Sequence, residues 1–360
     1  MLSPKTIFIF AFFVCISFSL FSQDTLKTVT KQDTVKALIL EDNKHKAEQY
    51  YNNGIAEFKS KNFTNALASF TQAINLDSTF ERAYYNRGTT KFEMKNYKAA
   101  IEDFNSALKI KESPDSYFSR AQAEDELDDP KAAMADYTKT IAVKVDYAQA
   151  YYYRGEIKFQ ADDYIAAIED YNLAIKYKPD YSYAFNDRAS AKLQLEKYDE
   201  AISDYTQGLK ANSDMPFAYN NRGSAYRKKG NYMSAISDYT EAINHKHDYA
   251  IAYNNRGSAK FENGDYAGAV EDFTDAIKHR RNYEFAMNNR AVAKFKLKDY
   301  KGSVADCDAA ITLNPKYGNA YYNRAIAKEM LRDDAGACAD FKKAAELGVD
   351  AAKNYTGGCN

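Results

Sequence analysis

Arginine and aspartate recur along the sequence as pairs sixteen residues apart. A row of arginines could bind an anionic ligand. An arginine that is half-buried between helices instead needs a carboxylate partner, because an unpaired buried charge is costly. We favour this second interpretation, which predicts an arginine–aspartate bond between two helices of one repeating unit or between neighbouring units. The arginines are Arg87, Arg120, Arg154, Arg188, Arg222, Arg256, Arg290 and Arg324, and the aspartates are Asp103, Asp136, Asp170, Asp204, Asp238, Asp272, Asp306 and Asp340.

Asparagines form a second recurring set, in stretches that are expected to be helical. Asparagine is a mediocre helix former, so its recurrence there requires a reason. Its side-chain amide donates and accepts hydrogen bonds, which suits the extended backbone of a bound peptide. The alternative is that these amides bond to a neighbouring helix. The candidates are Asn86, Asn221, Asn255, Asn289 and Asn323 at one position of the unit and Asn186, Asn220, Asn254 and Asn288 at the position before it.

In other copies of the unit, the earlier of these two positions carries an aromatic residue. Two of these aromatic residues, Tyr85 and Tyr152, are further candidates for binding. Such rings could make hydrophobic contacts with a partner, although tyrosine often only covers a half-exposed groove. We favour ligand binding for the earlier position and leave binding and structural bonding equally open for the later one.

Residues that could support catalysis or metal binding do not form a recognisable site. His245, His247 and His279 lie near the expected ends of helices in adjacent units, without further ligands at metal-binding spacing. Paired acids such as Glu271-Asp272 recur with the unit, so we interpret them as structural. No phosphate-binding loop, nucleophile elbow or zinc-protease motif is present. We therefore predict a protein that is not an enzyme, with no catalytic residue, metal site or cofactor.

The elements that must position these residues follow from an internal repeat. Nine small residues lie 34 positions apart, except for one step of 33. Twelve residues after each comes another small residue, and four later an aromatic residue follows in eight of the nine copies. Such offsets place the residues on one face of a helix, so each unit is expected to contain two helices. The nine small residues are Gly54, Gly88, Ala121, Gly155, Ala189, Gly223, Gly257, Ala291 and Ala325.

This pattern resembles the tetratricopeptide repeat (TPR), a helix–turn–helix unit of about 34 residues. The resemblance implies an all-α, right-handed superhelical solenoid, in which each unit buries its apolar face against its neighbours. It also implies that the first helix of each unit, helix A, lines a concave groove that binds a partner, chiefly through positions 2, 5, 6, 9, 12 and 13. The units span residues 47–80, 81–113, 114–147, 148–181, 182–215, 216–249, 250–283, 284–317 and 318–351, and a tail follows over 352–360.

The sequence departs from the family at two positions of the unit. Position 7 carries arginine where the family usually has leucine, and position 11 often carries lysine where it usually has tyrosine. The family's terminal proline is retained only at Pro179 and Pro315. An arginine in place of a packing leucine strengthens the expectation of a carboxylate partner.

The first residues predict export. Lys5 precedes an apolar run over residues 7–21, which ends at Ser22, as in a secretory signal peptide over residues 1–22 that is cleaved after Ser22. The run is short for a membrane span, although an uncleaved anchor remains the alternative. Residues 23–46 lack clear periodicity and are predicted to form a linker that joins the first helix near Leu40. The mature protein is therefore expected in the periplasm or cell envelope, or outside the cell.

Composition excludes several classes of function. The 49 basic and 50 acidic residues nearly cancel, which argues against a strongly basic nucleic-acid-binding protein. The cysteines expected in the mature chain are Cys307, Cys338 and Cys359, whose disulfide state stays open. We predict a non-catalytic scaffold that binds a protein or peptide segment in the groove. A self-associating structural subunit of the envelope is the alternative, and an enzyme that uses the groove is a weaker one.

Overall fold

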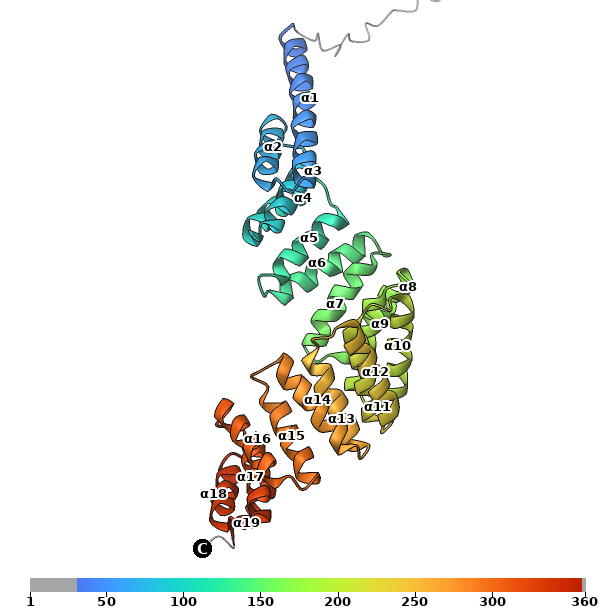
Figure 1. Ribbon diagram of the computed structural model, residues 1–360. Coiled ribbons are helices and arrows are strands. Elements are labelled where there is room, and N and C mark those ends of the chain that lie inside the picture. The colour runs from blue at the N-terminus through green and yellow to red at the C-terminus, as the bar shows by residue number, and fades with distance from the viewer. Residues whose placement is uncertain (1–30, 358–360) are drawn as a thin grey trace, which may run out of the picture. The chain divides into compact units, whose positions relative to one another are not determined.

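The structure is a computed structural model that describes residues 31–357 (Figure 1). All regular secondary structure in this range is α-helical, which confirms the predicted fold class. Each predicted unit contains one pair of helices, and a further helix follows the ninth pair. The helices are α1 (Lys31–Lys59), α2 (Phe63–Leu76), α3 (Glu81–Glu93), α4 (Tyr97–Ile110), α5 (Pro114–Asp125), α6 (Pro130–Val143), α7 (Ala148–Gln160), α8 (Tyr164–Tyr177), α9 (Ser182–Gln194), α10 (Tyr198–Ala211), α11 (Pro216–Lys228), α12 (Tyr232–His245), α13 (Ala250–Glu262), α14 (Tyr266–His279), α15 (Glu284–Lys296), α16 (Tyr300–Leu313), α17 (Gly318–Met330), α18 (Asp334–Glu346) and α19 (Asp350–Thr356).

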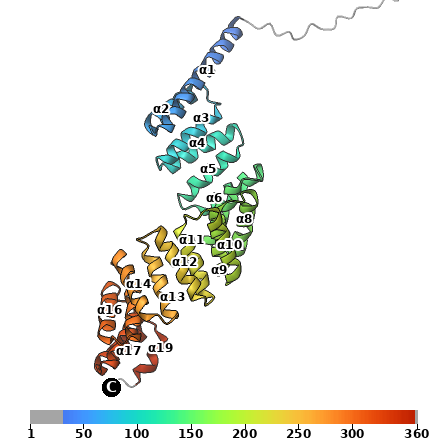
Figure 2. The same cartoon turned by 45° about the vertical axis from the view of Figure 1, so that its right-hand side comes forward.

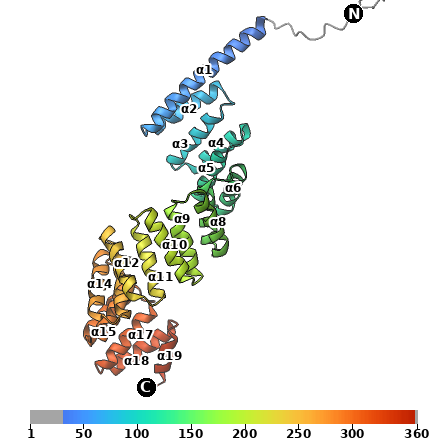
Figure 3. The ribbon, with the colours of Figure 1, turned by 90° about the vertical axis from the view of Figure 1, so that its right-hand side faces the viewer.

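The described chain divides into two compact parts, one that ends at Thr90 and one that begins at Lys91, and each is described by itself. In the N-terminal part, α1 packs against α2 through a cluster that includes Ala47, Ala73 and Ile74. In the C-terminal part, successive helices from α4 to α19 lie side by side in chain order (Figures 2 and 3). This arrangement is a solenoid, because each helix pair contacts mainly the pairs next to it in the sequence.

Helix α1 begins at Lys31, so the predicted linker over residues 23–46 is wrong for residues 31–46. This segment contains neither proline nor glycine, and an ion pair of 2.6 Å joins Lys46 to Asp42 one turn earlier. Once the packed half after Ala47 is helical, each further residue adds a hydrogen bond without a new nucleation cost. Periodicity alone missed this segment, because its side chains, Leu38 and Ile39 included, are largely exposed.

Each turn between the two helices of a unit contains one residue with a positive φ at position 15. Only the sixth and seventh units meet this requirement with glycine, at Gly230 (φ 81°) and Gly264 (φ 89°). Lysine, aspartate, glutamate or arginine adopts the left-handed conformation in the other units, as Lys298 does at φ 65°. The following residue caps helix B, as Asp265 does by accepting a hydrogen bond of 2.9 Å from the Gly268 backbone N–H.

The turn provides a matched pair of stability predictions. We expect Gly264→Ala to lower the free energy of unfolding by about 1–2 kcal/mol, because a Cβ disfavours this backbone conformation. The added Cβ would meet no atom within 4 Å, so a steric clash does not contribute to the loss. Lys298→Gly should raise the free energy of unfolding by a smaller amount, since glycine also gains entropy in the unfolded chain. Urea unfolding measures both changes. A loss of stability in Lys298→Gly would contradict the backbone argument.

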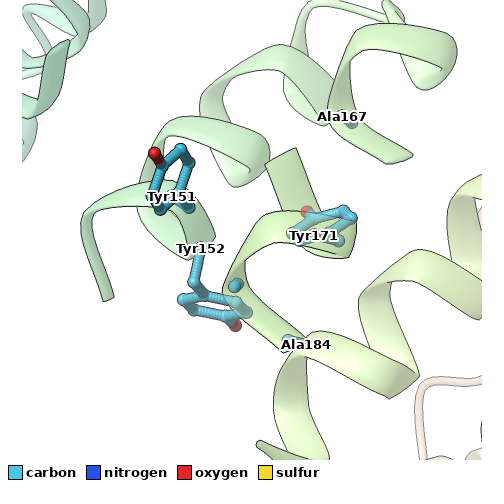
Figure 4. Close-up of a cluster of buried hydrophobic side chains, with 6 residues drawn as sticks. Tyr151, Tyr152, Ala167, Tyr171 and Ala184 are labelled. Carbon is cyan, nitrogen blue, oxygen red and sulfur yellow. The ribbon is translucent and has the colours of Figure 1, made fainter. Parts of the chain in front are cut away.

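The core of each unit is built from a small residue on helix A and an aromatic ring on helix B. A Cβ added at Gly155 or Gly223 would lie 2.9 Å from the ring of Tyr171 or Tyr239, which explains why this position accepts only small residues. Figure 4 shows Tyr171 in a cluster with Tyr151, Tyr152, Ala167 and Ala184. In the eighth unit Cys307 takes the place of the ring and is fully buried as a free thiol.

The first part of the predicted tail over residues 352–360 belongs to α19, which extends to Thr356. Ala352 of α19 is fully buried against α18. The ring of Tyr355 stacks on that of Phe341, with ring centroids 4.5 Å apart. This short helix covers the end of the solenoid. The predicted signal peptide, its cleavage after Ser22 and the thiol of Cys359 lie outside the described residues. Among residues 31–357, no helix is both long enough and apolar enough to span a membrane.

Candidate functional site

The helix A surfaces of units six to eight enclose a cavity of about 530 Å³, which we call the asparagine cavity. It contains three of the predicted binding residues, Asn254, Asn255 and Asn289. Its walls come from helix A positions 2, 5, 6, 9, 12 and 13, the positions that the family resemblance assigned to the groove. The other lining residues are Arg227, Ser258, Phe261, Glu262, Phe273, Tyr283, Phe285 and Val292.

The asparagines form a ladder of hydrogen bonds from one unit to the next. Asn255 Nδ2 donates to Asn220 Oδ1 at 3.0 Å, and Asn289 Nδ2 donates to Asn254 Oδ1 at 3.0 Å. A third bond of 2.8 Å joins Asn323 Nδ2 to Asn288 Oδ1. In units seven to nine the residue at position 6 is therefore the donor, and the residue at position 5 of the preceding unit is the acceptor.

This ladder corrects our preference for position 5 as the binding position. Asn220, Asn254 and Asn288 are buried, with at most 9% of their surface exposed, and their carbonyl oxygens are already bonded. Position 6 is half-exposed, and Asn255 and Asn289 each use only one amide hydrogen in the ladder. Their carbonyl oxygens have no hydrogen-bond partner among residues 31–357. In units seven and eight, the groups that can reach a ligand therefore belong to position 6.

The remaining predicted residues lie elsewhere. Asn86 donates to Tyr51 Oη at 3.1 Å and to the backbone oxygen of Arg82 at 2.9 Å, and its neighbour Tyr85 is half-buried. The ring of Tyr152 is 7% exposed and packs in the core, so this tyrosine is not an open contact surface. Asn186 and Asn221 line a different cavity of about 290 Å³, formed by units four to six.

Sequence analysis missed an ion pair in the asparagine cavity. Arg227 Nη1 lies 2.8 Å from Glu262 Oε1, and both side chains are about one-third exposed. The Nε of Arg227 is buried without a hydrogen-bond partner in the described chain. These residues occupy positions 12 and 13 of helix A, so the register could have identified them. Arginine stands at position 12 only in unit six, and position 13 holds glutamate in only three of the nine units, so neither residue forms a row along the repeats.

The predicted arginine–aspartate pairs are present in units three to nine. Arg222 Nε donates to Asp238 Oδ2 at 2.8 Å and Nη2 donates to Oδ1 at 2.7 Å, which is a two-pronged bond between helices A and B of one unit. The third nitrogen, Nη1, donates to Thr206 Oγ1 of the preceding unit at 3.0 Å. The same guanidinium thus joins two helices and two units. The arginine–aspartate bond within one unit is confirmed, whereas the partner of Arg222 in the preceding unit is a threonine.

The lysine at position 11 bonds to the same aspartate. Lys260 Nζ, for example, lies 2.9 Å from Asp272 Oδ2, whose side chain is only 3% exposed. Six units share this bond between the lysine at position 11 and the aspartate. A buried carboxylate thus holds an arginine and a lysine in place at positions 7 and 11, where the family usually has leucine and tyrosine. The six lysines are Lys91, Lys158, Lys192, Lys260, Lys294 and Lys328.

The third unit has a glutamate at the position of this lysine. Burial, and after it the charge of Asp136, raises the pKa of Glu124 to about 7. One oxygen of its carboxyl group is buried without a partner in the described part of the chain. The acidic run that starts at Glu124 is therefore not only a solvated helix end. A proton on Glu124 near neutral pH relieves its repulsion from Asp136.

The histidines make ordinary surface contacts. The ring of His245 stacks on Tyr219 and its Nδ1 lies 3.2 Å from Asp214 Oδ1, while the ring of His279 stacks on Tyr253. Among the residues that the structure describes, no three acidic, histidine or cysteine side chains form a group that could hold a metal ion.

Helix pairs in register, a small residue facing a buried ring and a polar groove on helix A define a helical repeat protein. Family models confirm the particular repeat. Models described as tetratricopeptide repeat match residues 81–114, 118–182, 182–215 and 254–318, and one described as TPR repeat matches residues 223–264. The chain is a tetratricopeptide repeat protein. No curated protein matches the sequence.

The fold is shared with solved structures of two bacterial proteins. A TPR protein from Parabacteroides merdae is 19% identical with a TM-score of 0.51, and the match covers 69% of this chain and 99% of that one. The C-terminal part of a TPR repeat-containing protein from Cytophaga hutchinsonii is 21% identical with a TM-score of 0.55, over 66% of this chain and 98% of that one. At these identities the likeness establishes the fold, which suggests a protein–protein interaction scaffold.

Proposed function

We propose that this protein is a non-catalytic scaffold that binds an extended segment of a partner protein in the asparagine cavity. The observation that carries the proposal is the half-exposed pair Asn255 and Asn289, which the ladder holds in place while their carbonyl oxygens remain unbonded. Ordered amides lose little side-chain entropy when they bind a peptide backbone. The buried, unpartnered Nε of Arg227 adds a donor for a carbonyl oxygen of the segment.

The apolar walls of the cavity favour a segment with an apolar side chain. Phe261, Phe285 and Val292 line the cavity together with the asparagines. Aromatic and aliphatic groups supply affinity through burial, and the amides fix the direction and register of the backbone. The Arg227–Glu262 ion pair adds a polar edge, which discriminates among partners more than it adds affinity.

We propose further that the protein acts in the cell envelope or periplasm after export, as the apolar run before Ser22 predicts. Self-association through the same groove is the second candidate function, since a helical solenoid can also stack on copies of itself. An enzyme that uses the groove has no support beyond the carboxylates themselves.

Cross-linking from inside the cavity tests the proposal. A photoreactive phenylalanine analogue at position 292 should capture a partner in the native envelope, whereas the same analogue at Ile165, which is 66% exposed on α8, should not. The change Asn255→Ala with Asn289→Ala should reduce capture at least about fivefold, because two backbone hydrogen bonds are lost. The helical signal should remain unchanged.

Two outcomes contradict the proposal. Equal capture from position 165 would place the binding surface outside the cavity, and unchanged capture in the double variant would make the ladder purely structural. If the captured protein is a second copy of this chain, self-association replaces partner binding as the function.

A further inference from the structure

The cavity formed by units four to six differs chemically from the asparagine cavity. Two carboxylates line this cavity of about 290 Å³, which we call the acidic cavity. Glu156 takes the place of Ser258, and Asp187 takes the place of Asn289, at the same positions of helix A. No lysine or arginine contributes to its wall. The lining residues are Glu156, Phe159, Gln160, Tyr171, Asn186, Asp187, Ser190 and Asn221.

One hydroxyl group joins the two carboxylates. Tyr152 Oη lies 2.7 Å from Asp187 Oδ2 and 3.1 Å from Glu156 Oε1. A phenol has a single hydrogen to donate, so the second of these hydrogen bonds needs a proton on a carboxyl group. Burial raises the pKa of both carboxyl groups, that of Glu156 to about 7, so the pair shares this proton near neutral pH. The empty cavity thus needs a proton to offset its negative charge.

A buried amide oxygen in the same wall also lacks a donor. Asn186 is 3% exposed, and its Nδ2 donates to Asp187 Oδ1 at 2.8 Å. This bond fixes the amide, and its Oδ1 has no hydrogen-bond partner among the described residues. In the next unit the equivalent oxygen, that of Asn220, accepts from the ladder, so the ladder is interrupted at Asn186. A buried acceptor without a donor destabilises the site, and a ligand with N–H groups would remove that cost.

We propose that the acidic cavity binds the guanidinium or ammonium group of a basic side chain from a partner segment. Such a group supplies the N–H donor that Asn186 Oδ1 lacks, and its charge, placed beside Glu156 and Asp187, replaces the proton between the carboxylates. The rings of Phe159 and Tyr171 in the wall can contact the cation through their faces. Ca²⁺ is a poorer fit, because it takes about six to eight oxygen ligands.

This proposal rests on the proposed function, because it names one residue type that the bound segment carries. The acidic cavity and the asparagine cavity occupy the same helix A positions, in units four to six and six to eight. A segment that follows helix A would therefore place a basic residue in one cavity and an apolar residue in the other.

The proton in the empty cavity gives binding a defined pH dependence. The charged and titratable groups that face Glu156 include Tyr152 on its own helix, Asp187 on α9, Tyr171 on α8 and Asp125 on α5. Tyr153, Tyr181, Lys178 and Asp180 line a neighbouring space that Glu156 also borders. A cation competes with the proton on Glu156, so affinity should rise as the pH increases through about 7, by about tenfold between pH 6 and pH 8.

Short peptides test the site without knowledge of the natural partner. The probe is a fluorescein-labelled pentapeptide with a central arginine between alanines, and its match carries citrulline, which keeps the shape but not the charge. The arginine peptide should bind at least about tenfold more tightly to the full protein, by fluorescence anisotropy. Glu156→Gln with Asp187→Asn should remove this preference, whereas Glu169→Gln on the exposed face of α8 should leave it intact.

Calorimetry on the unaltered protein keeps the test independent of any variant's folding. Binding of the arginine peptide at pH 7 should release protons, so the measured heat should depend on the ionisation enthalpy of the buffer. Equal affinity for the arginine and citrulline peptides would overturn the proposal, as would loss of the preference in Glu169→Gln but not in the double variant. Binding of Ca²⁺ alone, without binding of the peptide, would replace the proposal with a metal site. Cross-linking from position 292 decides the proposed function separately.

Discussion

Asp238→Ala is expected to lower the free energy of unfolding by about 3–5 kcal/mol, because it leaves the Arg222 guanidinium half-buried without its carboxylate. Unit six makes the test clean, since position 11 carries Tyr226 there and supplies no second cation. The Asp238 side chain is 7% exposed and that of Arg222 is 18% exposed. Urea unfolding followed by circular dichroism measures the loss, and Glu241→Ala on the exposed face of the same helix is the control.

The two partners of this pair respond differently to burial. The bond to Asp238 raises the pKa of Arg222, which reflects a favourable interaction, whereas burial raises the pKa of Asp238 in spite of the guanidinium. The carboxylate is the more buried partner, so it bears more of the desolvation cost. The pair as a whole should therefore contribute little net stability.

Joint replacement of the pair follows from this balance. Arg222→Leu with Asp238→Ala should recover most of the stability that Asp238→Ala alone loses, because no charge then remains buried. If Asp238→Ala leaves the melting temperature unchanged while Arg222→Ala abolishes partner binding, the arginine row serves a ligand and the structural interpretation fails.

Tyr205→Ala should cost a similar amount, about 3–5 kcal/mol, because it removes a fully buried ring and leaves a cavity. The ring is 1% exposed and packs among Ala189, Ala201 and Ala225, which cannot expand to fill the space. The loss should appear in urea unfolding and as faster amide hydrogen exchange in α9 and α10, since each unit is stabilised by its neighbours.

Tyr205→Phe separates the ring from its hydroxyl group. It keeps the packing and removes only the bond of 2.9 Å between Tyr205 Oη and Ser190 Oγ, so it should cost about 0.5–1.5 kcal/mol. If the alanine and phenylalanine variants lose equal stability, the hydroxyl group rather than the ring would hold this part of the unit together.

Two consequences of the register were accessible from the sequence. Small residues such as Gly223, with an aromatic residue sixteen positions later, required a helix pair with close packing. The recurrence of Arg222 with Asp238 required a bond between those two helices. Both inferences depend only on the 3.6-residue period within a helix and on the register between adjacent helices. The period and the register can both be read from the spacing of the repeated residues.

The tertiary structure alone decided which polar groups remain open to a ligand. Asn254 and Asn255 are adjacent in the chain, yet the first is a buried acceptor in the ladder and the second is a half-exposed donor. The acidic cavity likewise depends on Tyr152 and Asp187, which come from different units. Sequence periodicity assigns a residue to a face of its own helix. The rotation of the neighbouring helix determines which atoms meet across the interface, and therefore which hydrogen bonds remain unmade.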